Sequence, residues 1–143
     1  MAETKYGKYI VTELQVPDFQ PEFVKKYAEF AKRILWLDDN VVEGAFQMNC
    51  SWYLKANDEH LAQAHVHDTD EIIGFFGSDP DDPHNLHAEI EFWMEDERHI
   101  IIKSCLIFVP RGMKHLPLIL KWVDKPIFHF TTVNAGQYVP KPV

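Results

Sequence analysis

The sequence has few cysteines and no closely spaced pair of them. Cys50 and Cys105 lie far apart in the chain, each within an apolar run. This spacing excludes a metal site of the CxxC type. We expect two buried, reduced thiols in a reducing compartment rather than a disulfide.

Basic residues are in the minority. The chain has 14 Lys and Arg against 22 Asp and Glu, which gives a formal net charge of −8 at pH 7. Such an average field repels phosphate backbones and anionic lipid surfaces. The sequence also has no basic stripe with interleaved aromatic residues, so nucleic acid is not an expected partner.

Long hydrophobic runs are missing as well. No stretch approaches the ~20 apolar residues that a membrane helix needs, and residues 1–14 lack the apolar run of a signal peptide. We therefore expect a soluble, cytoplasmic protein without a membrane partner.

The composition is that of a folded domain. The chain has 143 residues, of which 46% are hydrophobic and 25% are charged, with no internal repeat and no Gly- or Ser-rich linker. We expect a single domain over residues 1–143, with a helical or strand N-terminal extension over about 1–40 and a barrel core over about 41–133.

One substantial helix is predicted in the N-terminal extension. Apolar residues recur there at helical spacing, namely Phe23, Tyr27, Phe30 and Ile34. Pro21 suits a first helical turn, and Asp18 stands nearby as a candidate cap. The aromatic stripe is typical of a packing face rather than a ligand site.

From residue 41 onward the period changes to two. In residues 46–54 the apolar set is Phe46, Met48, Cys50, Trp52 and Leu54, and the alternating set is Gln47, Asn49, Ser51 and Tyr53. Seven or eight short strands, including residues 61–67, follow one another without helices, which predicts an all-β antiparallel sandwich or barrel. A parallel α/β sheet is excluded, and the Cys…Trp…Cys arrangement of an immunoglobulin sandwich is missing.

Three polar residues on adjacent strands carry the first chemical signal. His65 and His67 project to the same face of an extended strand, and Glu71 opens the next strand after a short turn. Imidazole and carboxylate together suit a transition metal better than calcium. The HxHxxxE spacing alone is weak evidence for a metal site. A second segment strengthens it, because Pro110 and Gly112 predict a turn directly before another histidine, His115.

Together the two segments resemble the motifs of the cupin superfamily. His65, His67, Glu71 and Gly77 match the first motif, with the glycine one place early, and Pro110, Gly112 and His115 match the second. Three non-ligand positions depart from the motifs and hold Glu59, Ser104 and Ile119. The resemblance implies a jelly-roll barrel that holds one divalent transition metal ion (Fe, Mn, Ni, Co or Zn) on His65, His67, Glu71 and His115.

The five other histidines are not assigned to the metal. These are His60, His84, His87, His99 and His129. Of these, His129 is expected nearest to it, because it stands among aromatic residues in a strand.

The resemblance implies a metal-dependent enzyme acting on a small oxygenated organic molecule, of the dioxygenase, isomerase or lyase class. The alternative is a non-catalytic small-molecule binding or sensor protein with a bound metal, and a weaker one is a barrel with an empty site. Because barrels of this kind expose sheet edges, a homodimer is expected.

Which residues bind the substrate depends on which strand face lines the pocket. The candidates are Gln47, Asn49, Trp52, Tyr53 and His129. Glu89 and Glu91 share a strand face and are the only carboxylates outside the ligand set that we consider as a general base.

Overall fold

The computed structural model of the chain describes residues 4–57 and 63–143. Glu59, His60 and the first two residues of the strand predicted over 61–67 lie outside the described residues. Within the described ranges, no helix is long and apolar enough to cross a membrane.

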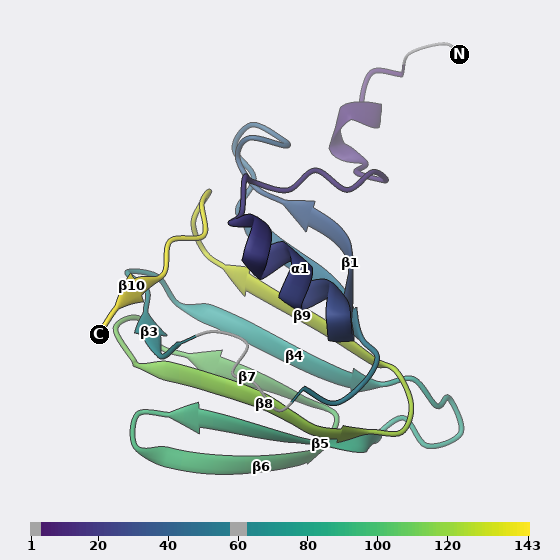
Figure 1. Cartoon of the computed structure of the whole chain (residues 1–143). Helices are drawn as coiled ribbons and strands as arrows, with labels where there is room; N and C mark the ends of the chain where they lie inside the picture. Colours follow the sequence, from purple (N-terminus) through teal and green to yellow (C-terminus); the bar gives the residue numbers. More distant parts are fainter. Residues whose placement is uncertain (1–3, 58–62) are drawn as a thin grey trace.

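Two five-stranded antiparallel sheets form the molecule (Figure 1). The first sheet has the order β1 (Ala31–Leu37), β2 (Gln47–Tyr53), β9 (Ile127–Val133), β4 (Glu71–Gly77) and β7 (Cys105–Val109). The second has the order β10 (Lys141–Pro142), β3 (His65–Val66), β8 (His115–Val123), β5 (Asn85–Met94) and β6 (Glu97–Lys103). The helical elements are η1 (Gly7–Tyr9) and α1 (Pro21–Phe30). This architecture confirms the prediction of an all-β antiparallel jelly roll with one N-terminal α-helix.

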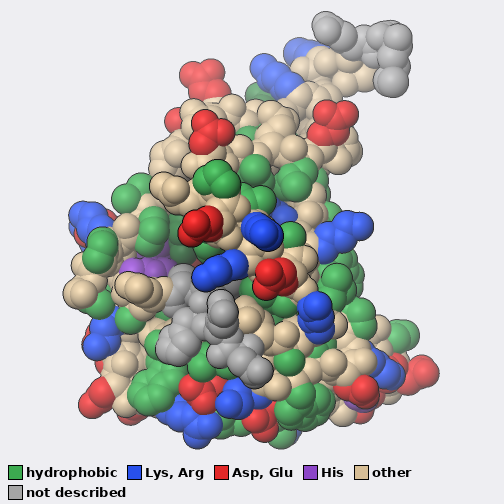
Figure 2. Space-filling model, viewed as in Figure 1, with side chains coloured by type: hydrophobic (Ala, Val, Ile, Leu, Met, Phe, Trp, Pro, Cys, Tyr) green, Lys and Arg blue, Asp and Glu red, His purple; other side chains and the backbone are tan. Residues whose placement is uncertain are grey.

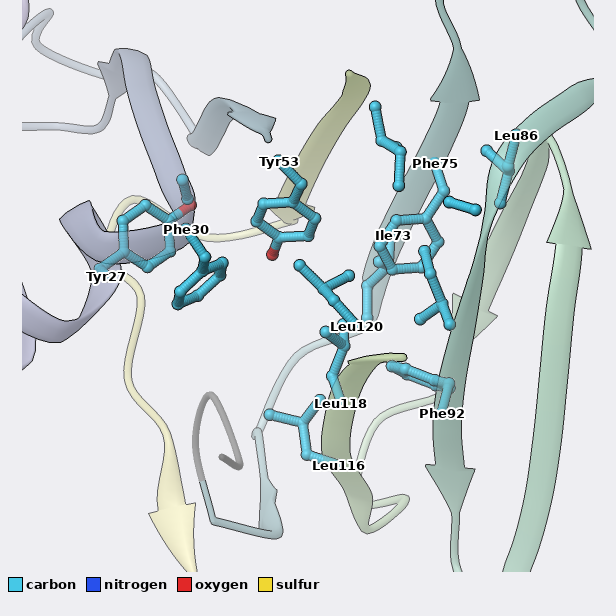
Figure 3. Packing of buried hydrophobic residues seen from close by; sticks show 14 of the residues in the cluster. Tyr27, Phe30, Tyr53, Ile73, Phe75, Leu86, Phe92, Leu116, Leu118 and Leu120 are labelled. Atoms are coloured by element: carbon cyan, nitrogen blue, oxygen red, sulfur yellow. The ribbon is translucent and has the colours of Figure 1, made fainter. Parts of the chain in front are cut away.

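The hydrophobic core lies between the two sheets and continues under α1. Leu116, Leu118 and Leu120 of β8 lie toward Ile73 and Phe75 of β4 in Figure 3. On the other side of the same figure, Tyr27 and Phe30 of α1 point toward Tyr53 of β2. The helix therefore completes the core at the β1–β2 side of the first sheet.

The helix is shorter than the apolar pattern predicts. Pro21 is its first residue, as expected, but Gln20 rather than Asp18 occupies the N-cap position, and α1 ends at Phe30. Ile34 belongs to β1, which pairs with β2. Ala31 lies opposite Tyr53 at one end of this pairing, and Leu37 lies opposite Met48 at the other. Strand pairing has overridden the helical spacing at this point, because tertiary context outweighs weak local preferences.

The two faces of β2 have different environments. Gln47, Asn49, Ser51 and Tyr53 are buried, whereas Met48, Cys50 and Trp52 are only half-buried. The mostly polar face thus points into the molecule, where it lines a cavity described below. Both cysteines are free thiols, as expected, but each is half-buried rather than buried.

Candidate metal centre

Three histidines converge where β3 meets β8. His65 of β3 lies directly opposite His115, the first residue of β8. His67 follows the end of β3, and the ligating ring nitrogens of the three histidines all lie within 4.8 Å of one another. Side chains almost fifty positions apart in the sequence therefore share one point in space.

The turn before β8 connects the two motifs. Gly112 has a φ of +82°, a region that favours glycine, and its N–H donates to the carbonyl oxygen of His67 at 3.0 Å. The Met113 N–H closes the turn on the carbonyl oxygen of Pro110. The second motif is therefore hydrogen-bonded to the first, which directs His115 toward His65 and His67.

Each of the three imidazole rings is oriented by a main-chain carbonyl. The Nδ1 atoms of His65, His67 and His115 lie 3.0–3.1 Å from the carbonyl oxygens of Gln63, Val139 and Met113, respectively. A carbonyl only accepts, so the proton lies on Nδ1 and the Nε2 lone pair is free. This is the ring orientation that outer hydrogen bonds impose on metal-ligating histidines.

Glu71 adds an oxygen to the same point. Its Oε1 lies 2.9 Å from His115 Nε2 and 3.6 Å from His67 Nε2. Adjacent ligands on one transition-metal ion are ~3 Å apart when each bond is ~2.1 Å long. The carboxylate oxygen is thus spaced as a neighbouring ligand of His115 and, more loosely, of His67.

The four atoms share a further property. The three Nε2 atoms and Glu71 Oε1 are all buried without a hydrogen-bond partner. Leaving one such group unsatisfied costs ~1–3 kcal/mol. Because the Nε2 atoms carry no proton, they cannot donate to the carboxylate, and a cation satisfies all four acceptors at once. The residues present therefore fit a transition-metal ion.

The electrostatics favour the ligating form of the histidines. Burial, followed by the neighbouring His115 and His67, lowers the pKa of His65 to about 4. Burial also lowers the pKa of His67. At neutral pH these rings are uncharged and can ligate.

A cavity of about 110 Å³ extends from His65, Glu71 and His115 into the barrel. For comparison, a protein cavity of ~150 Å³ binds benzene. Figure 2 shows histidine atoms partly covered by hydrophobic side chains at the flank where Figure 1 draws β3 and β10. We call His65, His67, Glu71 and His115 the metal end of the cavity.

Aromatic residues from the N-terminal part of the chain line the rest of the cavity. We call Phe19, Tyr27, Arg33 and Trp36 the aromatic end. The sequence pattern of α1 indicates only packing, so the contribution of Tyr27 to the cavity and the presence of Arg33 were missed. The one available signal is that two cations, Lys32 and Arg33, stand inside the otherwise apolar segment 30–37.

Four of the five candidate substrate-binding residues line this cavity: Gln47, Asn49, Tyr53 and His129. Trp52 does not. It lies on the opposite face of β2, where its ring contacts Phe128 with 5.5 Å between centroids. The mostly polar face of β2 is therefore the one that lines the cavity.

The two candidate general bases and the other described histidines do not line the cavity. Glu91 accepts hydrogen bonds from Trp93 and Arg98, which lower the pKa of its carboxyl group. Neither Glu89 nor Glu91 lines the cavity. The Nε2 atoms of His87 and His99 lie near the carboxylates of Asp79 and Glu97, respectively, and His84 is exposed.

His129 is buried in a stack of rings. Its imidazole lies between Tyr53 and Phe75, with centroids 4.5 and 5.0 Å away, and Nδ1 donates to the carbonyl oxygen of Gly74 at 3.1 Å. Burial lowers its pKa to about 3. Burial likewise raises the pKa values of Tyr53 and Tyr138. These three side chains are therefore neutral at pH 7.

Comparison with known proteins supports the fold. No protein-family model and no curated protein matches the sequence. Among solved structures, a recombinant oxalate oxidase in complex with glycolate matches with a TM-score of 0.52 and 12% identity over 91% of this chain. The aligned region is 61% of that chain, less than two thirds of its length.

Two other solved structures are similar at lower TM-scores. They are the polyketide cyclase RemF from Streptomyces resistomycificus (0.49, 13% identity, 79% of this chain and 69% of that chain) and KdgF from Halomonas sp. (0.43, 13%, 76% and 78%). The two antiparallel sheets and the likeness to the oxalate oxidase structure show the cupin fold, as the two motifs imply. At such identities the likeness concerns the fold alone.

Proposed function

We propose that the protein is a metal-dependent enzyme of the cupin fold that acts on a small oxygenated organic molecule. His65, His67, Glu71 and His115 hold one divalent transition metal ion. The single observation that carries this proposal is the set of four buried acceptor atoms, three Nε2 and one Oε1, that face one point and have no hydrogen-bond partner. An ion held by these ligands supplies a Lewis acid or, if it is redox-active, one-electron chemistry.

The cavity walls contribute binding and orientation rather than proton transfer. Outside the metal end, the titratable groups that line the described cavity are tyrosines, Arg33 and His129. With a pKa of about 3, His129 is a weak base, and the raised pKa values of Tyr53 and Tyr138 keep both phenols protonated. This favours reactions in which the substrate is activated at the metal end.

The same observation favours a second candidate function. A protein that holds a small molecule at a metal without changing it needs no general base, and outside the metal end the one histidine that lines the described cavity, His129, has a pKa of about 3. The two functions differ only in whether the ligand leaves chemically altered.

Elemental analysis followed by a turnover assay tests the proposal. Purified protein is expected to contain close to one equivalent of a transition metal. Protein loaded separately with Fe(II), Mn(II), Ni(II), Co(II) and Zn(II) is then given carbonyl, enol and catechol compounds while products and dioxygen uptake are measured. Stoichiometric metal with product formation supports the enzyme. Tight binding with full recovery of unaltered ligand supports the binding protein, and absence of metal binding contradicts both.

A further inference from the structure

Arg33 occupies an unusual position at the aromatic end of the cavity. Its guanidinium lies 4.6 Å from the ring centroid of Tyr27, 5.0 Å from that of Phe19 and 5.5 Å from that of Trp36. The faces of aromatic rings attract cations, so three rings hold the guanidinium in place. Its position is therefore set by the protein before any ligand arrives.

The charge of Arg33 is not neutralised by a described residue. Its side chain donates one hydrogen bond, from Nη1 to Asn49 Oδ1 at 2.6 Å, and Asn49 is an uncharged amide. No described carboxylate lies within ion-pair distance of Arg33. Among the described residues, Glu71 is the only carboxylate that lines the cavity, and it belongs to the metal end. A guanidinium has five N–H donors, so most of them remain available.

One further donor in the cavity has no partner. Gln47 is fully buried, and its Nε2 makes no hydrogen bond. Gln47 Oε1 accepts from the Val133 N–H at 3.3 Å, which identifies Nε2 as the free end of the amide. Gln47 and Asn49 lie on the same face of β2. The cavity thus combines a cation that has no described counter-ion with an unpaired neutral donor, an arrangement that binds an anion.

We propose that Arg33 and Gln47 bind the carboxylate of a small organic acid, whose remaining oxygen functions point toward the metal end. The planar fork of a guanidinium matches the planar carboxylate, and Arg is the side chain best suited to this pairing. A cavity of about 110 Å³ suits a ligand portion of a few carbon atoms. This inference rests on the proposed function for the choice of substrate, but the carboxylate contact itself does not require the metal.

The test therefore measures carboxylate binding in both metal-free and Zn(II)-loaded protein. The probes are acetate, pyruvate, lactate and levulinate, each compared with its uncharged amide, and inorganic phosphate as a different anion. Calorimetry gives the dissociation constants, and metal content is determined separately for every sample. A failure of metal binding is thereby distinguished from a failure of the carboxylate site.

Two variants alter the charge at the site in different ways. Arg33→Met removes the cation. Asn49→Asp places a carboxylate where Arg33 already donates, which neutralises the cation with almost no change in shape. Lys32→Met is the matched control, because Lys32 carries the same charge on the same strand but is exposed.

At least one carboxylate is expected to bind the wild-type protein without metal and to bind at least tenfold more tightly than its amide. Both Arg33→Met and Asn49→Asp are expected to weaken that binding at least tenfold, while Lys32→Met leaves it within twofold. The proposal is overturned if no carboxylate binds, if phosphate binds in preference, or if carboxylates bind only with Zn(II) and equally well in all variants. The last result would indicate direct binding to the metal and would leave the proposed function intact.

Discussion

The metal end and the aromatic end of the cavity hold their polar side chains by different means. At the metal end, each imidazole is fixed by a main-chain carbonyl, and the backbone of one motif is hydrogen-bonded to the other. At the aromatic end, Arg33 is held by rings and by a single side-chain amide. A hydrogen bond to a main-chain carbonyl is kept when the residue that carries the carbonyl is substituted, whereas a contact with a side chain is lost when that side chain is substituted. Under the proposed function, the metal end is the part suited to preserve one chemistry, and the aromatic end is the part suited to select the ligand.

Removal of a ligand at the metal end should have the largest effect. His115→Ala is expected to lower metal affinity by more than ~100-fold, because loss of an outer-shell partner alone costs ~10–100-fold. The melting temperature of the metal-loaded protein should fall with it, since a ligand that binds only the native state stabilises that state. Metal titration and calorimetric melting provide the measurements.

The control for this variant is His99→Ala, which removes an exposed histidine near Glu97. It should retain wild-type metal content. Unchanged metal content in His115→Ala would refute the ligand assignment and, with it, the distinction between the two ends.

The pH dependence of stability tests the stack around His129, which lies within the cavity but is no metal ligand in the proposal. Its pKa is about 3 in the folded protein, against the ordinary value of 6.5 for a histidine. The unfolded chain therefore takes up a proton between these values that the folded protein excludes, so stability falls as the pH falls from about 6.5 to about 3. This contribution is on the order of a few kcal/mol.

His129→Phe should flatten that acid dependence. Phe keeps an aromatic ring between Tyr53 and Phe75 but loses the hydrogen bond to Gly74, which costs about 1 kcal/mol at neutral pH. Urea unfolding of metal-free protein at a series of pH values should give curves that cross, with the variant more stable in acid. The charged group that faces His129 is Arg33, which stays protonated throughout this range. Parallel curves would show that His129 titrates normally.

Local sequence patterns predict parts of the metal end, whereas the meeting of His115 with His65 depends on the pairing of β3 with β8. A period of two places His65 and His67 on one face, and Pro110 with Gly112 specifies a turn whatever the surroundings. The alternation along β2 was also correct, although the choice between its two faces had to come from the structure. Alternation specifies which residues share a face but not which face is buried.

The aromatic end could not be predicted in the same way. Arg33, Tyr27 and Asn49 meet only because β1 pairs with β2 and α1 packs beside them. Because Ile34 and Phe30 are at helical spacing, the sequence pattern assigned Ile34 to the helix rather than to strand β1. No local pattern encodes a contact between a cation and three rings from separate elements, so this part of the cavity depends on the complete fold.

A backbone substitution can weaken the metal end selectively. Gly112→Ala places an L-residue at a φ of +82°, which costs ~1–2 kcal/mol, and should disturb the hydrogen bond from Gly112 to His67. We expect a loss of about 1 kcal/mol in the free energy of unfolding together with a several-fold loss of metal affinity.

Gly44→Ala is the matched control for Gly112→Ala. Gly44 has a φ of +86°, and, as at Gly112, an added Cβ would contact nothing within 4 Å. It lies in the β1–β2 connection, away from the metal ligands. The two variants should lose similar stability, whereas only Gly112→Ala should lose metal affinity. Equal metal affinity in both would mean that the Gly112 turn does not position the ligands.

The smallest effect on the cavity is expected from the outer face of β2. Trp52→Leu removes the edge-to-face contact with Phe128 and should cost about 1 kcal/mol of stability. Asn49, three positions earlier, points the other way and holds Arg33. We therefore expect Trp52→Leu to leave the dissociation constants for metal and carboxylates within twofold of wild type, measured by the same calorimetry. A tenfold change would mean that the outer face of the strand controls the cavity, and the assignment of ligand selection to the aromatic end would then be wrong.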